Sequence, residues 1–437
     1  MILDGLATFR FSYKNWEIVD LRIDLPKFGP GSDAINNHTQ YSNPVAICKR
    51  DGLEGIGAGF TLGLGNDLVC KAIDDILNMW DGYSLKEIAG QTKTSVYDVL
   101  ANPQQIRWLS PNSGVNYQAV GVIVNTIVDL LSKEFGKPAW EAFTLINETE
   151  CSRFYDDLVN LSFVDSLEFL FDNPCFTLRD FNKPCLPIYH TTWIGSSSDA
   201  LVSEIEQEYR NKGVTIFKIK IGRNIESFLT KIVEVKKQLP NSIRLCVDAN
   251  QTLTLAAAKK FVMSAEDLGL LWLEEPFAPD NILAFQCLIE YCKQNRLSIE
   301  IVTGENCPSP HMAAALMAIG INRFQADPCR MLGFVDVVLI SLLSRHYGVP
   351  ITPHAGGSCL DELSAHISFF DRVSNNYSIE LGLLEHVGFC SKFMLAPVIV
   401  SGGKISAPQE PGLLVGFTGD VRSKFKKYKD GITWLKP

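Results

Sequence analysis

The residues best suited to catalysis stand at the ends of short apolar runs. Lys218 and Lys220 close one such run, two residues apart. In a strand both would face the same side, because side chains alternate along extended chain. They are either solvated lysines at a strand end or two ammonium groups at a common site. In the second case each lowers the other's pKa, and one can act as a base.

Acidic residues follow the next three runs. Asp248 ends one run, Glu274 stands in the doublet Glu274-Glu275, and Glu305 follows a third run. Each alone fits a helix cap or a solvated loop acid. Together they predict a cation site, because carboxylates that converge would repel each other, and hard oxygen ligands select Mg²⁺. In the doublet only one carboxylate points inward, and strand alternation does not say which.

Two later runs end near a carboxylate and an imidazole, Asp327 and His354. A carboxylate beside a histidine raises the pKa of the imidazole and fixes its tautomer. The alternative is that His354, which precedes the turn Ala355-Gly356-Gly357, merely caps that turn. Glu385 follows the last run and adds another acid.

A repeat of strand-like and helix-like segments carries these residues. Eight apolar runs alternate with amphipathic segments, at residues 186–191, 214–221, 243–247, 270–273, 299–303, 323–326, 349–352 and 377–380. Eight βα units in series predict a (β/α) barrel, in which catalytic side chains gather at the carboxyl ends of the strands. A doubly wound sheet would need a glycine fingerprint, and Gly63-Leu64-Gly65 lacks the third glycine.

The first 150 residues follow another pattern. Strands are expected at 18–23, 45–48 and 55–60, and helices at 67–79 and 115–135. We therefore predict an N-terminal α+β capping domain (1–150), a barrel domain (151–390) and a proline- and glycine-rich C-terminal segment (391–437) that returns to the cap.

Composition excludes several classes of protein. The 437 residues are 46% hydrophobic and 20% charged, as in globular proteins, and carry a net charge of −9 that argues against nucleic acid as a partner. The twelve cysteines form no Cys-x-x-Cys pair, which predicts reduced thiols. No membrane span or signal peptide is expected. The cytoplasm is therefore the expected location, with the mitochondrion as the alternative.

This set of side chains fits one kind of reaction. Removing a proton next to a carboxylate leaves an enediolate, which a divalent ion stabilises while a lysine takes the proton. An acid on the opposite face can then reprotonate the carbon, which gives racemisation, or protonate a β-hydroxyl, which gives dehydration. The residues fit both outcomes.

These residues resemble the enolase superfamily, in its mandelate racemase group, and further motifs are similar to those of L-fuconate dehydratases. The further motifs are Gly31-Ser32-Asp33-Ala34, Tyr41-Ser42, Phe60-Thr61-Leu62-Gly63, Arg107-Trp108, Gly136-Lys137-Pro138, Trp193-Ile194-Gly195, Phe217 to Gly222, Asp248-Ala249-Asn250-Gln251 and Pro353 to Gly357. The resemblance implies a modified TIM barrel, (β/α)7β, with a cap built from the N-terminal region and the C-terminal tail.

The resemblance also implies roles. Asp248, Glu274 and Glu305 would hold one Mg²⁺ per active site, which selects Glu274 from the doublet. Lys220 would take the α-proton, with Lys218 beside it. His354, oriented by Asp327, would help the 3-hydroxyl leave. Contacts with the substrate would come from Asn250, Glu385, Ser32, Asp33 and Trp193. The implied reaction converts L-fuconate to 2-keto-3-deoxy-L-fuconate and water.

Two alternatives stay open. The sequence departs from the family at Thr252-Leu253 and in the segment that follows Asp327. One alternative is therefore a dehydratase, racemase or epimerase acting on another acid sugar, and the second is a non-catalytic binding protein on the same scaffold. In each case the expected partner is a small acid sugar, and analogy with the family suggests a homo-oligomer.

Overall fold

The structure is a computed structural model that describes residues 2–25, 40–101, 113–144, 146, 185–192, 197–222, 224–375 and 382–427. The predicted substrate contacts Ser32, Asp33 and Trp193 lie outside these ranges, as do the Arg107-Trp108 motif and the predicted run 377–380.

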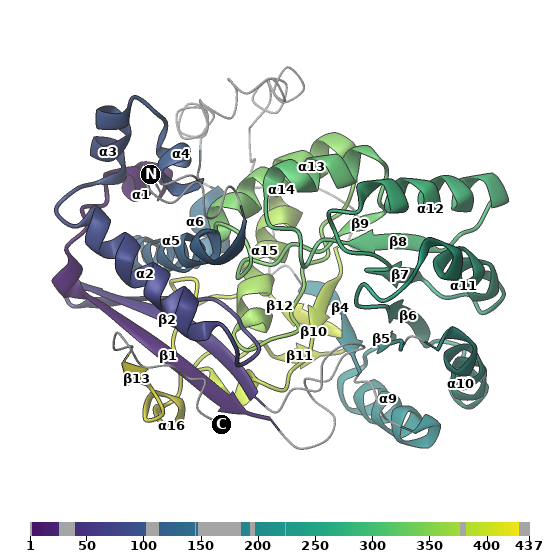
Figure 1. Ribbon diagram of the computed structural model, residues 1–437. Coiled ribbons are helices and arrows are strands. Elements are labelled where there is room, and N and C mark those ends of the chain that lie inside the picture. The colour runs from purple at the N-terminus through teal and green to yellow at the C-terminus, as the bar shows by residue number, and fades with distance from the viewer. Residues whose placement is uncertain are drawn as a thin grey trace.

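The N-terminal part forms a sheet covered by helices (Figure 1). Its elements are α1 (Ile2–Thr8), η1 (Tyr13–Asn15), β1 (Trp16–Asp24), β2 (Gln40–Arg50), β3 (Leu53–Ala58), α2 (Asn66–Trp80), α3 (Leu85–Thr92), α4 (Val96–Ala101), α5 (Gly114–Glu134) and α6 (Ala139–Thr144). The antiparallel sheet has the order β13-β1-β2-β3, in which β13 (Lys426–Lys427) comes from the far end of the chain. The strands and helices predicted for this part are all present.

Helix α5 is the central helix of the cap. Its own residues are mostly apolar around the whole circumference of the helix. Most of its side chains are buried, from Tyr117 through Leu131. Its length and composition would suffice to cross a membrane, but 78% of its apolar window is buried inside the protein. An all-round apolar helix buried in this way is a core helix.

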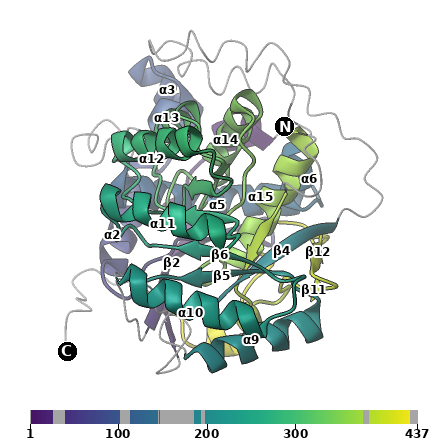
Figure 2. The same cartoon turned by 90° about the vertical axis from the view of Figure 1, so that its right-hand side faces the viewer.

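The second part is a parallel sheet flanked by helices. Its elements are β4 (Cys185–Thr191), α9 (Ser198–Lys212), β5 (Ile216–Lys220), α10 (Ile225–Gln238), β6 (Arg244–Asp248), α11 (Leu255–Asp267), β7 (Trp272–Glu274), α12 (Ile282–Asn295), β8 (Glu300–Thr303), α13 (Pro310–Ala318), β9 (Arg323–Phe324), α14 (Phe334–Tyr347), α15 (Leu360–Asn375) and β10 (Leu384–His386). Strands β4 to β9 are neighbours in chain order, and β10 pairs with the other side of β4. Figure 2 shows α9 to α12 stacked over one face of this sheet.

Helix starts follow the strand ends regularly. The residue before each of α9, α10, α11, α12 and α13 uses its side-chain oxygen to accept a hydrogen bond from a backbone amide of the first turn. These capping residues are Ser197, Asn224, Thr254, Asn281 and Ser309. Such caps satisfy amides that have no partner within the helix, so each βα unit begins its helix at a defined place.

One predicted run differs in detail from the structure. The run 349–352 forms a single parallel bridge, Phe324 to Ile351, although further backbone hydrogen bonds keep this segment beside β9. The predicted run 377–380 lies outside the described residues, and the strand after it, β10, contains Glu385 and pairs with β4. The parallel sheet with its capping domain confirms the predicted fold class.

The C-terminal segment contacts both parts. It contains η2 (Ser391–Phe393), β11 (Val400–Ser401), β12 (Lys404–Ser406) and α16 (Gly419–Arg422), and β12 pairs with β4. In the cap, the carbonyl of Gly412 accepts a hydrogen bond from the Ala139 amide at 2.8 Å. The amides of Leu413 and Leu414 donate to Asp129 Oδ1 at 2.6 and 2.9 Å. The predicted limits at residues 150 and 390 stay predictions.

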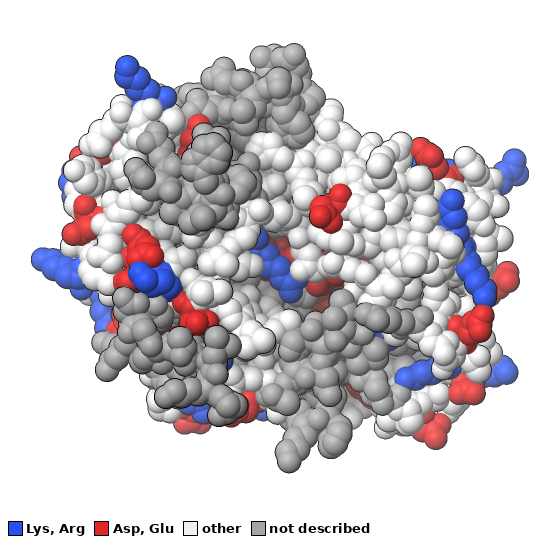
Figure 3. Space-filling model, viewed as in Figure 1, with Lys and Arg blue, Asp and Glu red and all other residues white. Residues whose placement is uncertain are grey.

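Charges of both signs are scattered over the face seen in Figure 3. A hollow near the middle of this face holds acidic and basic side chains close together (Figure 3). Among the described residues on this face, lysine and arginine form no large field of one sign.

Candidate active site

Strand register brings the first three candidate residues side by side. Lys220 is opposite Asp248 across β5 and β6, and Asp248 is opposite Glu274 across β6 and β7. Glu305 follows β8, the next strand. Oxygens of Asp248, Glu274 and Glu305 all lie within 4.8 Å of one another, and all three residues are buried. The sheet therefore gathers three acids at the carboxyl ends of neighbouring strands.

The two adjacent acids at the end of β7, Glu274 and Glu275, lie in different surroundings. Glu274 lies in the three-acid cluster, and its Oε2 accepts a hydrogen bond from Trp272 Nε1 at 3.3 Å. Glu275 has a positive φ of 40° and turns elsewhere, where Asn306 Nδ2 donates to its two oxygens at 2.9 and 3.1 Å. Burial, with Glu305 next, raises the pKa of Glu275 well above its ordinary value. The unusual backbone conformation at Glu275 thus separates the roles of the two acids.

The two lysines have different nearest acids, although both lie within 3.9 Å of Asp248. Lys218 Nζ lies 2.6 Å from Glu274 Oε1 and 2.8 Å from Glu385 Oε1. Lys220 Nζ lies 2.9 Å from Asp248 Oδ2. Both side chains face the site, in agreement with their spacing.

The expected lowering of the lysine pKa is not found in this arrangement. Burial is the largest single cause and acts to lower the pKa of Lys220, but Asp248 and Glu305 together outweigh burial and Lys218 and raise it. Burial also acts to lower the pKa of Lys218, but Glu274 and Glu385 hold it well above its ordinary value. Like-charge repulsion between the lysines is therefore present but smaller than the effect of the acids.

Glu274 is in turn affected by its acidic neighbours. Burial is the largest cause that raises the pKa of Glu274, to about 8, and Asp248, Glu385 and Glu305 add to it against the opposing effect of Lys218. A carboxylate surrounded by other carboxylates favours a proton or a cation.

Asp327 and His354 form a hydrogen-bonded pair. Asp327 Oδ2 lies 2.9 Å from His354 Nδ1, and Asp327 Oδ1 accepts from the Cys329 amide at 2.8 Å. The other ring nitrogen, Nε2, lies 3.3 Å from Glu305 Oε2 and 3.1 Å from the donating amide of Gly356. Burial acts to lower the pKa of His354, but Glu305 and Asp327 raise it above its ordinary value.

Glu385 and Asn250 also lie at this site. Thr191 Oγ1 and the Ala355 amide donate to Glu385, the latter at 2.8 Å, so this acid links β4 and β10 to the segment after His354. Burial acts to raise the pKa of Glu385, but Lys218 and His354 hold it at about 2. Asn250 lies beside Asp248, to which its amide and Nδ2 donate at 2.8 and 3.0 Å.

Arg330 is a member of the site that the motif analysis did not identify. Its Nε lies 3.2 Å from Asp327 Oδ2, and its Nη1 donates to Glu305 Oε1 at 3.1 Å and to Asn306 Oδ1 at 2.7 Å. Burial is the largest single cause and acts to raise the pKa of Glu305, but His354, Arg330 and the two lysines together outweigh it and hold this pKa well below its usual range. The sequence feature that could have identified Arg330 is its position three residues after Asp327, on the same loop at the end of a strand.

The acid cluster has the donor chemistry of a hard divalent cation. Its three ligands are all carboxylates, which suit Mg²⁺. Oε2 of Glu305 is buried and accepts no hydrogen bond from any residue that the structure describes. A buried carboxylate oxygen without a hydrogen bond is costly unless a cation compensates it. The residues present therefore fit a Mg²⁺ ion.

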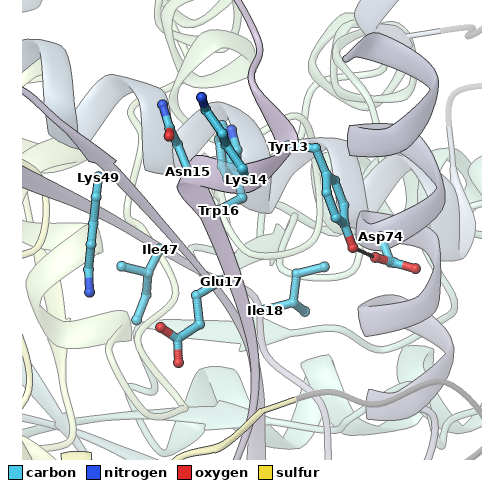
Figure 4. Close-up of a pocket in the computed structure, with 9 residues that line it drawn as sticks. All are labelled: Tyr13, Lys14, Asn15, Trp16, Glu17, Ile18, Ile47, Lys49 and Asp74. Atoms are coloured by element: carbon cyan, nitrogen blue, oxygen red, sulfur yellow. Dashed lines mark hydrogen bonds between the residues drawn. The ribbon is translucent and has the colours of Figure 1, made fainter.

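A separate pocket lies on the cap. Side chains of η1, β1, β2 and α2 line it, among them Lys14, Glu17 and Lys49, and Tyr13 hydrogen-bonds Asp74 at its side (Figure 4). None of the candidate catalytic residues lines this pocket, and no strand end of the parallel sheet reaches it.

Fold and site together define a class of protein: a parallel α/β barrel with a cap and a buried carboxylate cluster at its strand ends, flanked by lysines and an Asp–His pair. Residues 200–421 match the family described as Enolase C-terminal domain-like. This chain belongs to that family and to the enolase superfamily, as its motifs predicted.

Relatives of known name are similar over nearly the whole chain. Mitochondrial enolase superfamily member 1 from Homo sapiens is 28% identical over 430 residues, which cover 95% of this chain and 96% of the relative. L-galactonate dehydratase from Hypocrea jecorina is 29% identical over 442 residues, which cover 95% and 94%.

Solved structures agree with the fold. The crystal structure of the human mitochondrial enolase superfamily member 1 has a TM-score of 0.83 and 26% identity, covering 94% of this chain and 95% of that one. L-talarate dehydratase from Polaromonas sp. JS666, complexed with Mg and L-glucarate, has a TM-score of 0.69 and 19% identity, covering 94% and 97%. At that identity the second likeness concerns the fold alone.

Proposed function

We propose that this chain is a hydro-lyase that dehydrates a sugar acid with the help of one Mg²⁺ per active site, and that its substrate is L-fuconate. The observation that carries the proposal is the position of two proton-transfer groups at different ligands of one acid cluster. Lys220 lies 2.9 Å from Asp248, and His354 lies 3.3 Å from Glu305. A base and an acid beside one cation site are what α-proton removal with loss of a β-hydroxyl requires.

Asp248, Glu274 and Glu305 would hold the ion. Bound there, Mg²⁺ would act as a Lewis acid that stabilises negative charge on the substrate carboxylate.

Lys220 takes the α-proton on Nζ in this proposal. Its amine must be neutral to do so; burial and Lys218 favour the neutral form, and Asp248 and Glu305 favour the charged one. When Asp248 serves as a ligand, its charge is shared, so the balance at Lys220 shifts toward the effect of Lys218. Lys218, held by Glu274 and Glu385, stays charged and faces the substrate carboxylate.

His354 gives a proton to the departing 3-hydroxyl. Asp327 accepts from Nδ1, so Nε2 is the nitrogen that faces the cluster; it accepts from the Gly356 amide when the imidazole is neutral and carries the transferred proton when the imidazole is protonated. The C–H proton passes to Lys220, the C–O bond breaks, and water leaves. The resulting enol then becomes the 2-keto-3-deoxy acid. Asn250, Glu385, Ser32, Asp33 and Trp193 are proposed contacts of the substrate.

L-galactonate is the second candidate substrate, because the relative from Hypocrea jecorina bears the name of its dehydratase. L-fuconate differs from it only by lacking the 6-hydroxyl. We therefore propose assays with L-fuconate, L-galactonate and a set of D-sugar acids, each with Mg²⁺, that follow 2-keto-3-deoxy products. Product from D-sugar acids alone would overturn both assignments, whereas an epimer without keto product would favour racemisation.

Substitution of the proposed base tests the chemistry. Lys220→Ala is expected to lower kcat by about a thousandfold or more, because the other amine near Asp248, Lys218 at 3.9 Å, is held by Glu274 and Glu385 and cannot replace the base. The control is Lys237→Ala on the exposed side of α10, which should keep wild-type kcat. Equal activity of the two variants would remove Lys220 as the base, and folding is checked by circular dichroism.

Location and assembly complete the proposal. The name of the human relative refers to mitochondria. We propose that this chain works in the cytoplasm, with the mitochondrion as the alternative, and fluorescence imaging of the tagged full chain distinguishes the two. Its proposed partners are the acid sugar and further copies of the chain, and light scattering measures the oligomeric state.

A further inference from the structure

Four side chains form a closed ring at the candidate site. Asp327 Oδ2 contacts His354 Nδ1 at 2.9 Å, and His354 Nε2 contacts Glu305 Oε2 at 3.3 Å. Glu305 Oε1 then contacts Arg330 Nη1 at 3.1 Å, and Arg330 Nε returns to Asp327 Oδ2 at 3.2 Å. The ring joins a proposed cation ligand to the proposed general acid, and Arg330 is the member without an assigned role.

We propose that Arg330 is a positioning residue that couples the cation site to the general acid, an inference that rests on the function proposed above. By occupying Oε1 of Glu305, the guanidinium leaves Oε2 directed at the cluster and at His354. By contacting Asp327 Oδ2, it also fixes the carboxylate that orients the imidazole. Only a planar, branched cation can serve both acids at once, because its N–H groups diverge from one rigid plane.

Further hydrogen bonds hold both the guanidinium of Arg330 and the loop that carries it. Arg330 Nη1 also donates to the carbonyl of Glu305 at 3.2 Å and to Asn306 Oδ1 at 2.7 Å, so the guanidinium is tied to the whole strand-end turn after β8. On the other side, Asn125 of cap helix α5 donates to the Pro328 carbonyl at 3.2 Å. The arginine therefore sits on a loop that both the cap and the barrel restrain.

The chain contains a matched control on the same two strands. Arg323 begins β9 and lies 2.6 Å from Glu300, which begins β8, at the opposite ends of the strands from Arg330 and Glu305. Each arginine pairs with a glutamate of the neighbouring strand, and both are largely buried. Loss of either arginine removes a similar ion pair, but only Arg330 touches the candidate site.

The experiment compares Arg330→Gln, Arg330→Lys and Arg323→Gln. Thermal unfolding is measured without substrate during a MgCl₂ titration, and the midpoint concentration for stabilisation is determined. Arg330→Gln is expected to raise this midpoint about 10- to 100-fold, the usual cost of losing a partner of a metal ligand. Arg330→Lys should recover part of the shift, and Arg323→Gln should lower the melting temperature without moving the midpoint.

Kinetics at saturating Mg²⁺ test the link to the general acid. The kcat of Arg330→Gln is expected to fall about tenfold or more while KM changes by less than about threefold, because orientation of His354 matters in the transition state rather than in binding. A Mg²⁺ midpoint and a kcat both equal to wild type would overturn the inference. Should Arg330→Gln fail to fold, Arg330→Lys decides by the same two measurements.

The two proposals fail in different ways. If the wild-type protein turns over none of the sugar acids but Arg330→Gln still raises the Mg²⁺ midpoint, the proposed function is wrong and the coupling of Arg330 to the cation ligand stands. If the wild-type protein dehydrates a sugar acid and Arg330→Gln matches it in both measurements, the function stands and the role of Arg330 is wrong.

Discussion

At the scale of single residues, the geometry around Asp327 determines which nitrogen of His354 can act. One oxygen of Asp327 accepts from a backbone amide, and the other faces both His354 Nδ1 and Arg330 Nε. A carboxylate in that position requires a proton on Nδ1. Nε2 is left at the cluster, where proton transfer to a substrate hydroxyl can occur.

Asp327→Asn tests this assignment. The amide has nearly the same shape as the carboxylate but no charge, so it fixes the imidazole tautomer less well and no longer stabilises the imidazolium. We expect kcat to fall about a hundredfold or more, by analogy with the loss of the carboxylate from Ser-His-Asp triads, with little change in KM. Steady-state kinetics measure both, and a kcat within about threefold of wild type would contradict the role given to Asp327.

Single residues also show how far the sequence could predict the site. Lys218, Lys220 and Asp248 were predicted because each ends an apolar run, and strand ends are close together in a parallel sheet. The separation of Glu274 from Glu275 was not predictable from strand alternation, since it depends on a positive φ and on Asn306 from another strand. Arg330 was missed for the same reason: its partners lie on neighbouring loops.

At the scale of elements, helix α5 connects the cap to the loop that carries Arg330. Its Gly121 lies so near this loop that a Cβ atom there would be 2.1 Å from the carbonyl oxygen of Met331. The other atoms that such a Cβ would meet are also backbone atoms of this loop, so no flexible side chain can give way. A helix that is apolar on all sides needs such close contacts on several faces, and the sequence pattern predicted the helix but not its partner.

Gly121→Ala is therefore expected to destabilise the protein. The added methyl group would collide with backbone rather than with a flexible side chain, and overpacking of this kind costs about 1–3 kcal/mol. Urea unfolding of purified protein measures the change. The control is Gly90→Ala in helix α3, where a Cβ atom meets nothing within 4 Å and alanine should add about 0.5–1 kcal/mol. An equal free energy of unfolding for wild type and Gly121→Ala would show that the loop at Met331 moves to make room for the methyl group at no cost in stability.

The strands of the barrel were predictable to different degrees. Runs rich in apolar residues, such as 216–220, became strands, and helices α9 to α13 each start at a side-chain cap that the sequence carries, whereas α14 starts after Gly333 without one. The run 349–352 also holds β-branched residues, but it contains Pro350, which has no amide to donate, and it pairs with β9, which has only two residues in strand conformation. The proline and the short neighbour both limit pairing, and only the proline could be read from the run itself.

At the scale of the whole molecule, the cap and the barrel are joined by buried polar contacts. Asp336 at the start of α14 accepts hydrogen bonds from Tyr97 of α4 at 2.9 Å and from Tyr117 of α5 at 2.8 Å. The amide of Leu332 donates to the same carboxylate at 3.0 Å. Composition and pattern predicted two parts, but not this junction, because it unites residues separated by more than two hundred positions.

The junction should make stability depend on pH. Burial is the main cause that raises the pKa of Asp336 from 3.8 to about 6, against the effect of its hydrogen bonds. Between these values the folded protein holds a proton that the unfolded chain has lost, so the free energy of unfolding falls as pH rises from about 4 to about 6. At 1.36 kcal/mol per pKa unit the loss amounts to about 3 kcal/mol.

Chemical unfolding of wild type and Asp336→Asn across this pH range isolates the contribution, since other groups titrate alike in both proteins. The wild-type free energy of unfolding, minus that of the variant, should decline by about 2.4 kcal/mol between pH 4 and pH 7, since part of the full loss has already occurred at pH 4. Tyr97→Phe removes a hydrogen bond that lowers the pKa of Asp336, so its pH-dependent loss should extend to higher pH. If the free energy of unfolding depended on pH in the same way in all three proteins, Asp336 would keep its charge in the folded protein over this range, and the prediction would be wrong.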